Sequence, residues 1–364
     1  MESIAPLAST LAPAPEAAFD AVFDAASAAD SVADDAQEDG AALAEERQLA
    51  VPAAWHGQRL DRALAALAPE FSRSYLSQLI HEGAVTLAGC PALKPARRVK
   101  AGEPLTLTLR PTPQAQAFTA QAMPLAVLHE DEHLLVLNKP AGLVVHPAPG
   151  HWSGTLLNGL LAHGPAFARL PRAGIVHRLD KDTSGLMTVA KTRPAMDALV
   201  AAIAARQVSR EYLALAHRPW QGAAQRVVEA PMGRDPRHRQ RMAVVDLARH
   251  AGKPALTTFT LLGNAPHEPG CLVHARLGTG RTHQIRVHMA HIGHPLVGDT
   301  LYSGKPLAGF ARQALHAWQL QLIHPATQES QVFVAPIPSD LQALAAELQI
   351  ALPAQPPAAS SEGA

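Results

Sequence analysis

The chain has 364 residues, enough for more than one domain, and 48% of them are apolar, as expected of a globular protein. Its 31 acidic and 31 basic residues cancel, but residues 1–50 hold eleven acidic residues and one arginine, which leaves twenty acidic and thirty basic residues in 51–364. The excess of basic residues in 51–364 favours a polyanionic partner such as nucleic acid, with an ordinary solvated surface as the alternative. The distant pair Cys90 and Cys271 excludes a disulfide framework and a zinc ribbon, and no apolar run is long enough for a membrane span.

Both ends of the chain have the composition of disordered segments. Residues 1–50 are rich in Ala, Asp, Glu, Pro and Ser and carry charge of one sign, so they are predicted to form an acidic disordered tail. They lack the basic and then apolar pattern of a secretory signal, and a cytoplasmic setting is expected. Residues 351–364, rich in Pro, Ala and Ser, are predicted to be a second disordered tail.

A small domain is predicted over residues 55–110. Apolar residues at helical spacing, a capping Ser72 and short alternating β-branched runs indicate two helices followed by two strands. These elements are expected at 59–67, 72–80, 85–87 and 105–109. A group of basic residues lies between the two strands, which suits contact with phosphates, although a small cap domain without a partner would show the same pattern.

A linker rich in Pro, Gln and Ala is predicted at 111–123, and a larger domain at 124–345. The larger domain opens with a strand, a turn and a second strand over 134–147, followed by a short helix at 155–161. Lys139 lies at the turn, where a structural role is favoured over contact with a phosphate.

The most unusual stretch of the chain is 174–186. Apolar residues on both sides predict two buried strands, with a polar loop between them that holds two carboxylates around a lysine. Asp180 has Arg178 and Lys181 beside it, and a nearby cation would keep its carboxylate ionised as a nucleophile or base. The alternative is an Asx-type turn without chemistry.

Three further elements are predicted after this stretch. Residues 194–206 have helical spacing with proline in the first turn, and 208–215 have the composition of a strand. Tyr212 lies on that strand, where a half-buried structural tyrosine is the common alternative to a functional one. Residues 233–241 form a basic loop that is expected either to contact phosphate or to be a solvated surface loop.

Residues 277–288 combine glycines, an arginine and histidines, but they lack the GxxxxGK[ST] pattern of a phosphate-binding P-loop. Histidines crowd this stretch and the one after it, and such crowding raises the alternative of a metal site. The histidines concerned are His283, His288, His291 and His294. There is no HExxH pattern and no acidic ligand before Asp299, so no metal is expected.

Three motifs resemble the RluA family of pseudouridine synthases. The longest is His-Arg-Leu-Asp-Lys-Asp-Thr-Ser-Gly-Leu at 177–186, and the others are Arg-Glu-Tyr at 210–212 and Thr-Gly-Arg-Thr-His-Gln-Ile-Arg at 279–286. The small domain resembles the S4 RNA-binding domain. The resemblance implies an α+β fold, with a mixed, mainly antiparallel sheet and a central cleft behind a small S4-like α/β domain.

The resemblance also implies site residues. Asp180 would be the catalytic nucleophile, Tyr212 would pack against the target base, and Arg281 would pair with Asp180. Arg286 would instead support a strand or touch phosphate. His177 and Arg178 would lie near the displaced base or the RNA backbone. Further RNA contacts are expected from Arg59, Arg62, Arg73, Arg98, Lys100, Arg234, Arg237, Arg239 and Arg241.

The function implied is isomerisation of uridine to pseudouridine in RNA, with structured large-subunit (23S) ribosomal RNA as the expected partner. No group leaves and no oxidation state changes, so no cofactor is implied, and the chain is expected to act as a monomer away from membranes. Two alternatives belong to other classes. One is an RNA-binding ribosome-assembly factor without catalysis, and the other is a metal-dependent hydrolase that uses the histidines.

Overall fold

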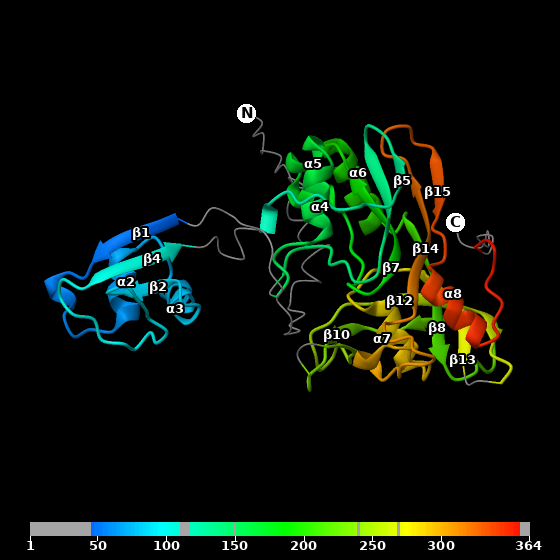
Figure 1. Cartoon of the computed structure of the whole chain (residues 1–364). Coiled ribbons are helices and arrows are strands. Elements are labelled where there is room, and N and C mark those ends of the chain that lie inside the picture. Colours follow the sequence, from blue (N-terminus) through cyan, green and yellow to red (C-terminus); the bar gives the residue numbers. More distant parts are fainter. Residues whose placement is uncertain (1–44, 110–116, 149, 239–240, 268–269, 357–364) are drawn as a thin grey trace, which may run out of the picture. The chain divides into compact units, whose positions relative to one another are not determined.

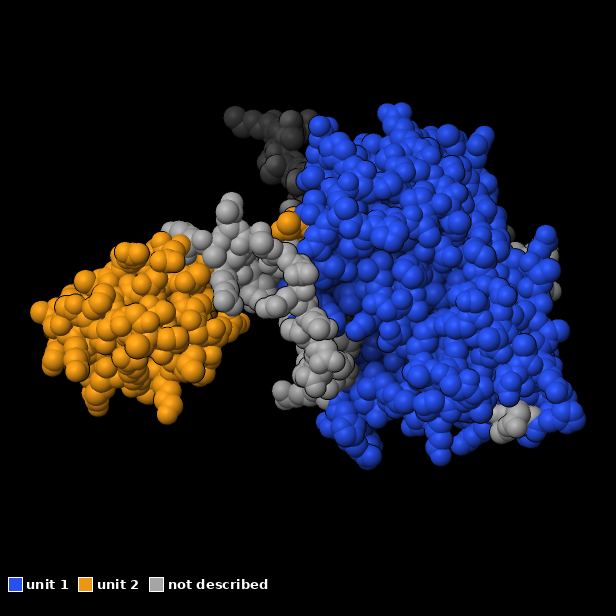
Figure 2. All heavy atoms as spheres, viewed as in Figure 1, with its two compact units in different colours: residues 1–32, 120–364 blue, residues 33–119 orange. Residues whose placement is uncertain are grey.

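The computed structural model describes most of the chain in two compact units, one ending at Thr119 and the other beginning at Ala120 (Figure 2). The described residues are 45–109, 117–148, 150–238, 241–267 and 270–356. Each unit has its own hydrophobic core. No helix in these ranges is long and apolar enough to cross a membrane.

The smaller unit is a four-stranded antiparallel sheet, with strand order β1-β4-β2-β3, packed against two helices (Figure 1). Its strands are β1 (Glu45–Ala50), β2 (Val85–Leu87), β3 (Cys90–Pro91) and β4 (Pro104–Leu109). Its helices are the 3₁₀ turn η1 (Ala53–Trp55), α2 (Leu60–Leu67) and α3 (Arg73–His81). The predicted helices and strands of this unit are therefore present.

The start of this unit differs from the sequence prediction. Residues 1–44 lie outside the described part of the chain, but Glu45–Ala50 form strand β1, so the prediction of a disordered tail is wrong for these six residues. Strand β1 pairs with β4 over its whole length, and Leu49 packs against the core. An edge strand needs apolar residues on only one face. The polar residues on its other face gave this segment a composition like that of the acidic residues before it, so the strand was not predicted.

The larger unit is built on one sheet of nine strands, in the order β5-β6-β7-β14-β8-β13-β12-β9, with β15 also paired to β14. Only the β7–β14 pair is parallel, which confirms the predicted mixed, mainly antiparallel α+β fold. The strands are β5 (Val127–Glu130), β6 (Leu134–Lys139), β7 (Ser184–Ala190), β8 (Ser209–His217), β9 (Gln225–Glu229), β12 (Leu256–Asn264), β13 (Gly270–Leu277), β14 (Leu315–Ile323) and β15 (Ser330–Val334). A separate hairpin pairs β10 (Met232–Arg234) with β11 (Met242–Val244).

Helices cover both faces of this sheet. They are α4 (Leu156–His163), α5 (Pro165–Ala168), α6 (Arg193–Ala204), α7 (Gln284–His291) and α8 (Ser339–Glu347), with 3₁₀ turns η3 (Pro171–Gly174) and η4 (Thr300–Tyr302). Helices α4 and α7 share one core with the face of β8 that carries Tyr212, whereas α8 packs on the opposite face around Leu213 and Trp318. Figure 1 shows α4, α5 and α6 gathered at one end of the unit and α7 at the other.

Two predicted strands are absent. The stretch 143–147 after β6 is a loop, and the carbonyls of Val144 and Val145 accept the first backbone N–H groups of α4. Ile175, before the polar loop, makes a single isolated bridge to Val189 instead of a strand. In both places the backbone groups form other hydrogen bonds, which start a helix or close a turn. They are therefore not available to pair with a neighbouring strand.

Strand β7 follows the polar loop and is buried along its whole length. Gly185 allows it to lie close to β14, because a Cβ atom at this position would be 2.1 Å from the carbonyl oxygen of Ala317, and its φ is +116°. Only glycine fits such a backbone and such an approach. The close parallel pairing fixes the end of β7, and with it the loop that carries Asp180.

Candidate active site

Asp180 lies in a cleft of about 420 Å³ in the larger unit. Four segments of the chain contribute most of the lining of this cleft: 176–180, residues 203–206 around the end of α6, the start of β8, and 277–286. The side chain of Asp180 is 17% exposed, so its carboxylate reaches the cleft while most of it is covered. The three family motifs therefore meet around one carboxylate.

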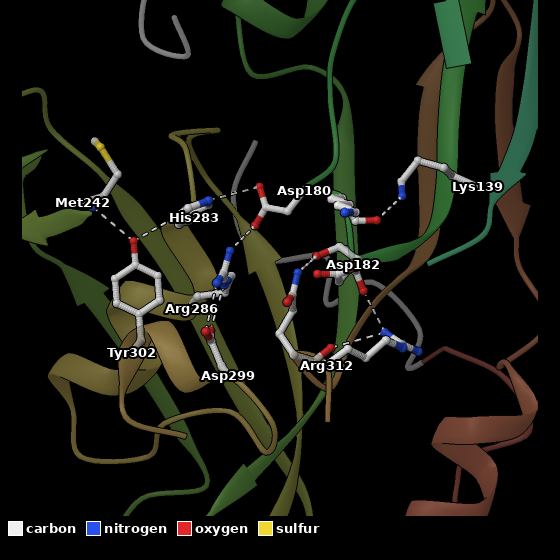
Figure 3. Close-up of polar contacts among 12 residues, drawn as sticks. Lys139, Asp180, Asp182, Met242, His283, Arg286, Asp299, Tyr302 and Arg312 are labelled. Carbon is white, nitrogen blue, oxygen red and sulfur yellow. Dashed lines mark hydrogen bonds and ion pairs between the residues drawn. The ribbon is translucent and has the colours of Figure 1, made fainter. Parts of the chain in front are cut away.

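A buried arginine holds this carboxylate in place. Nη1 of Arg286 donates to Oδ2 of Asp180 at 3.0 Å, while Nε and Nη2 donate to the two oxygens of Asp299 at 2.7 and 2.8 Å (Figure 3). The side chain of Arg286 is 7% exposed and that of Asp299 is 1% exposed. One guanidinium thus joins two carboxylates, using the planar fork that only arginine has.

The predicted pairing of Asp180 with Arg281 is wrong. Arg281 lies in the loop before α7, and its Nε donates to the backbone oxygen of Pro254 at 3.3 Å. Arg286 was expected to support a strand or touch phosphate, but it lies on helix α7. Helix α7 begins at Gln284, so Arg286 falls in its first turn, from which its side chain reaches both Asp180 and Asp299.

The charges around Asp180 keep it ionised. Burial alone would raise the pKa of this carboxyl group, but the positive charges of His283, Arg286 and Arg178 outweigh burial and lower the pKa to about 2. The carboxylate is therefore available at neutral pH without an accompanying proton. Such a group can act as a nucleophile or as a base.

His283 approaches the other oxygen of Asp180, with Nε2 at 3.8 Å from Oδ1. Its Nδ1 lies 2.7 Å from the hydroxyl of Tyr302, which also accepts the backbone N–H of Met242 (Figure 3). The ring of Tyr302 lies against the guanidinium of Arg286, 5.1 Å from centroid to Cζ. His283 adopts a left-handed backbone with φ of +57°, a strained conformation that surrounding contacts must hold in place.

Tyr212 projects from β8 into the same cleft and is 6% exposed. Burial raises the pKa of its hydroxyl to about 12, so the phenol is neutral at physiological pH. Within the described ranges its hydroxyl has no hydrogen-bond partner. The structure therefore brings Tyr212 beside Asp180 and leaves its hydroxyl free to meet a ligand.

Lys139 joins the polar loop to the turn that follows β6. Its Nζ donates to the carbonyl oxygens of Pro140, Leu143 and Lys181, at 2.8, 2.9 and 2.8 Å, and its side chain is fully buried. This geometry matches the favoured structural role and leaves no access for a phosphate. Because Lys181 follows Asp180 directly, the hydrogen bond from Lys139 fixes the backbone beside the carboxylate.

Residues near the C-terminus hold the other side of the loop. Nη1 of Arg312 donates to the carbonyl of Asp182 at 3.0 Å, and its other nitrogens grip Asp340 on α8. The amide of Gln313 donates to the hydroxyl of Thr183 at 3.2 Å. Arg312, Gln313 and Asp340 were not predicted as site residues, because nothing local in the sequence connects them with a loop about 130 residues away.

The crowded histidines have separate partners. His288 uses both ring nitrogens, one with the hydroxyl of Thr257 at 2.9 Å and the other with the carbonyl of Ala230 at 3.0 Å. Nδ1 of His294 lies 3.3 Å from the carbonyl of His217. In the described part of the chain, no three His, Cys, Asp or Glu side chains are arranged to hold a metal ion.

The other predicted RNA contacts of this unit are spread out. Arg178 is exposed at the cleft, whereas His177 is buried and its Nε2 accepts the backbone N–H of Thr188 at 3.0 Å. The predicted basic loop is the connection of the β10–β11 hairpin, in which Arg234, Arg237 and Arg241 are described and Arg239 lies outside the described residues. The guanidinium of Arg241 stacks on Tyr302, which links this hairpin to the network around Asp180.

In the smaller unit, two predicted contacts meet at one carboxylate. Arg59 and Arg73 both pair with Asp61, at 3.0 and 2.5 Å, and that side chain is only 5% exposed. Nη1 of Arg98 donates to the carbonyl of Gly57 at 2.6 Å. Arg62 and Lys100 are exposed, and within the described residues their side chains have no partner.

Comparison with known proteins identifies relatives along most of the chain. The family model for RNA pseudouridylate synthase matches residues 133–291. A "Ribosomal large subunit pseudouridine synthase D" from Neisseria meningitidis serogroup A is 46% identical over 317 residues, covering 83% of this chain and 82% of that protein. Proteins of the same name from Nitrosomonas europaea and Pseudomonas aeruginosa are 46% and 47% identical, covering 82% and 81% of this chain and 86% and 93% of those proteins.

Replacing Arg286 should have a much larger effect than replacing Arg281. Arg286→Ala removes the hydrogen-bonding partner of two largely buried carboxylates, so we expect it to lower the free energy of unfolding by about 3–5 kcal/mol. Arg286→Lys should recover little, because an ammonium group cannot grip both carboxylates. Arg281→Ala should change stability by less than about 1 kcal/mol. Urea unfolding of the three variants measures this, and equal losses for Arg281→Ala and Arg286→Ala would contradict the assignment.

The pKa of Asp180 predicts a pH dependence of stability. A carboxyl group whose pKa is lowered on folding, here to about 2, stabilises the fold above its unfolded pKa of about 3.9, and this contribution disappears as the pH falls towards 2. We expect the difference in unfolding free energy between wild type and Asp180→Asn to be constant from about pH 5 to 8 and to shift against the wild type below about pH 4. A shift in favour of the wild type on acidification would show that the pKa is raised.

Proposed function

The chain belongs to the family of RNA pseudouridine synthases, and on this basis we propose that its substrate is uridine in large-subunit ribosomal RNA. The observation that carries the proposal is the ionised carboxylate of Asp180, held by Arg286 at the bottom of a cleft that also contains Tyr212. The choice of RNA rests on the names of the relatives, which all refer to the large ribosomal subunit. We place this reaction in the cytoplasm, where ribosomal RNA is modified.

The reaction breaks the bond between N1 of uracil and C1′ of ribose and makes a bond between C5 and C1′. The proton on C5 is lost and N1 gains one, so atoms and electrons balance without a cofactor. Asp180 serves this reaction either by attacking the sugar or by assisting the loss of a sugar proton. Both routes need an unprotonated carboxylate, which is what the low pKa of Asp180 provides.

Uridine must leave the RNA helix before Asp180 can reach its glycosidic bond, so the target nucleotide flips into the cleft. A volume of about 420 Å³ is within the range of sites that enclose small molecules. Tyr212 packs on the flipped uracil, and its neutral hydroxyl is placed to hold or pass a proton as the base turns. Arg178 contacts the displaced base or the RNA backbone at the cleft.

The smaller unit supplies binding without chemistry. Its S4-like order of helices and strands and its exposed basic residues suit contact with the phosphates and shape of structured RNA. Arg59 and Arg73 keep about half of their side chains exposed although both pair with Asp61, so each retains donors for a phosphate. Arg62 and Lys100 are exposed and carry the sharpest test, because their substitution disturbs no described side-chain contact.

Asp180→Asn tests the reaction. The amide keeps the shape of the carboxylate and removes its charge, so we expect pseudouridine formation to fall below detection while RNA binding remains. Pseudouridines in large-subunit RNA would be mapped by carbodiimide primer extension in cells that lack the protein, and again after adding back wild type or Asp180→Asn. Sites that return with both proteins would show that the chain is a binding factor and that Asp180 is not its nucleophile.

Substitutions in the smaller unit test its role. Arg62→Gln and Lys100→Gln, each in the full chain, should lower the slope of log affinity against log salt by about one. Their folds should be unchanged, since neither side chain has a described partner. Filter binding of structured ribosomal RNA at several salt concentrations measures the slope. Slopes equal to that of wild type would show that Arg62 and Lys100 do not contact RNA phosphates.

A further inference from the structure

Three arginines that have no role in the proposed reaction line the cleft. Arg206 follows helix α6, Arg210 begins β8, and Arg281 lies in the loop after β13, and all three line the same cleft as Asp180. Among the residues that the structure describes, none of the three guanidinium groups pairs with a carboxylate. Like charges that gather without a counter-charge need a reason, because they repel one another.

Arg210 is placed by the alternation of β8. It is two residues from Tyr212, so both side chains point to the same face of the sheet, towards the cleft. Its guanidinium lies directly over Gly280, where a Cβ atom would be 2.6 Å from Nη1 and 3.2 Å from Cζ. Its Nε is buried and has no hydrogen-bond partner. Burial lowers the pKa of Arg210, because a buried charge loses its contact with water. A bound anion would compensate this loss of solvation.

Arg281 adds a second guanidinium to this group. Its only described side-chain bond, from Nε to Pro254, leaves both terminal nitrogens unused. Burial lowers the pKa of Arg281, and the positive charges of Arg206 and Arg210 lower it further, so the three guanidinium groups act on one another. Arg281 is therefore part of a cationic group at the cleft and not the partner of the catalytic carboxylate.

Arg206 occupies a backbone position that favours glycine. It directly follows the last turn of α6 with φ of +62°, and its N–H bonds to the carbonyl of Ile203. Glycine is the usual residue there, because a side chain strains a left-handed backbone. A cation near the end of a helix is also favoured by the helix dipole, which gives a purely structural alternative for this arginine.

We propose that Arg206, Arg210 and Arg281 together bind one backbone phosphate of the RNA, next to the uridine that enters the cleft. This inference rests on the proposed function, since it assumes that RNA is the ligand. Guanidinium groups pair with phosphate oxygens through two parallel hydrogen bonds. Such a contact fixes the position of the nucleotide beside Tyr212 without reading its sequence.

Arg206→Gly separates this role from the structural alternative. Glycine suits the left-handed backbone, so the urea midpoint of the variant should be unchanged or higher, and RNA affinity should fall with a salt slope lower by about one. The matched control is Arg218→Gly, because Arg218 is also an exposed arginine at positive φ, +72°, but does not line the cleft. It should leave affinity and salt slope unchanged. If Arg206→Gly alters only stability, the proposal is overturned.

Gly280→Ala tests the same site without changing any charge. The new methyl group must push the Arg210 guanidinium away, while the backbone of Gly280 is not in the left-handed region. We expect weaker RNA binding with an unchanged fold, measured by filter binding and urea unfolding. Affinity equal to that of wild type would show that the position of Arg210 over Gly280 has no bearing on RNA.

The decisive probe is an RNA stem-loop in which one phosphate beside the target uridine is replaced by a neutral methylphosphonate. With the full chain carrying Asp180→Asn, one of the two flanking replacements should weaken binding about tenfold, and this loss should vanish when Arg206, Arg210 and Arg281 are all changed to Gln. A loss that persists in the triple variant would place the phosphate elsewhere. Binding needs no turnover, so a failure of this test leaves the proposed reaction standing, and a failure to form pseudouridine leaves the phosphate site standing.

Discussion

The architecture of the larger unit depends on one guanidinium that joins two carboxylates. Asp180 must stay ionised in a covered cleft, and removing a carboxylate from water is costly unless a cation compensates it. Arg286 can compensate it because Asp299 fixes the opposite edge of the guanidinium and the ring of Tyr302 lies against it. Arg286, Asp299 and Asp180 come from the start of α7, the turn before η4 and the loop before β7, respectively. The three segments must therefore be placed accurately enough for the hydrogen bonds between them to form.

The rest of the site positions backbone more than side chains. Lys139 donates to the carbonyl of Lys181 and Arg312 donates to that of Asp182, so the backbone of both residues after Asp180 is held by basic side chains. Buried carbonyls need hydrogen-bond donors in any case, and these two side chains supply them. Rigid placement of a reactive group generally comes from such supporting contacts, and here they come from elements at both ends of the domain.

Local sequence patterns predicted most helices and strands, and the motifs predicted most of the residues around Asp180. Asp180 and Tyr212 were found because each lies in a short distinctive motif, and the structure brings them together. The error with Arg281 has a physical cause, since one motif contains two arginines and the helix start at Gln284 decides which of them reaches Asp180. Strand β1 was missed because an edge strand has little apolar pattern, and Arg312 because its contact spans about 130 residues.

Strand β14 lies between β7 and β8, although both precede it by about a hundred residues or more in the chain. While the ribosome is still making this protein, the gap between β7 and β8 therefore stays unfilled until almost the whole chain has emerged, and Arg312 and Asp340 arrive last. Pairings of such long sequence separation also form slowly. A nascent chain would thus lack the contacts of Arg312 with Asp182 and Asp340 throughout most of its synthesis, and the loop of Asp180 would gain this support only at the end.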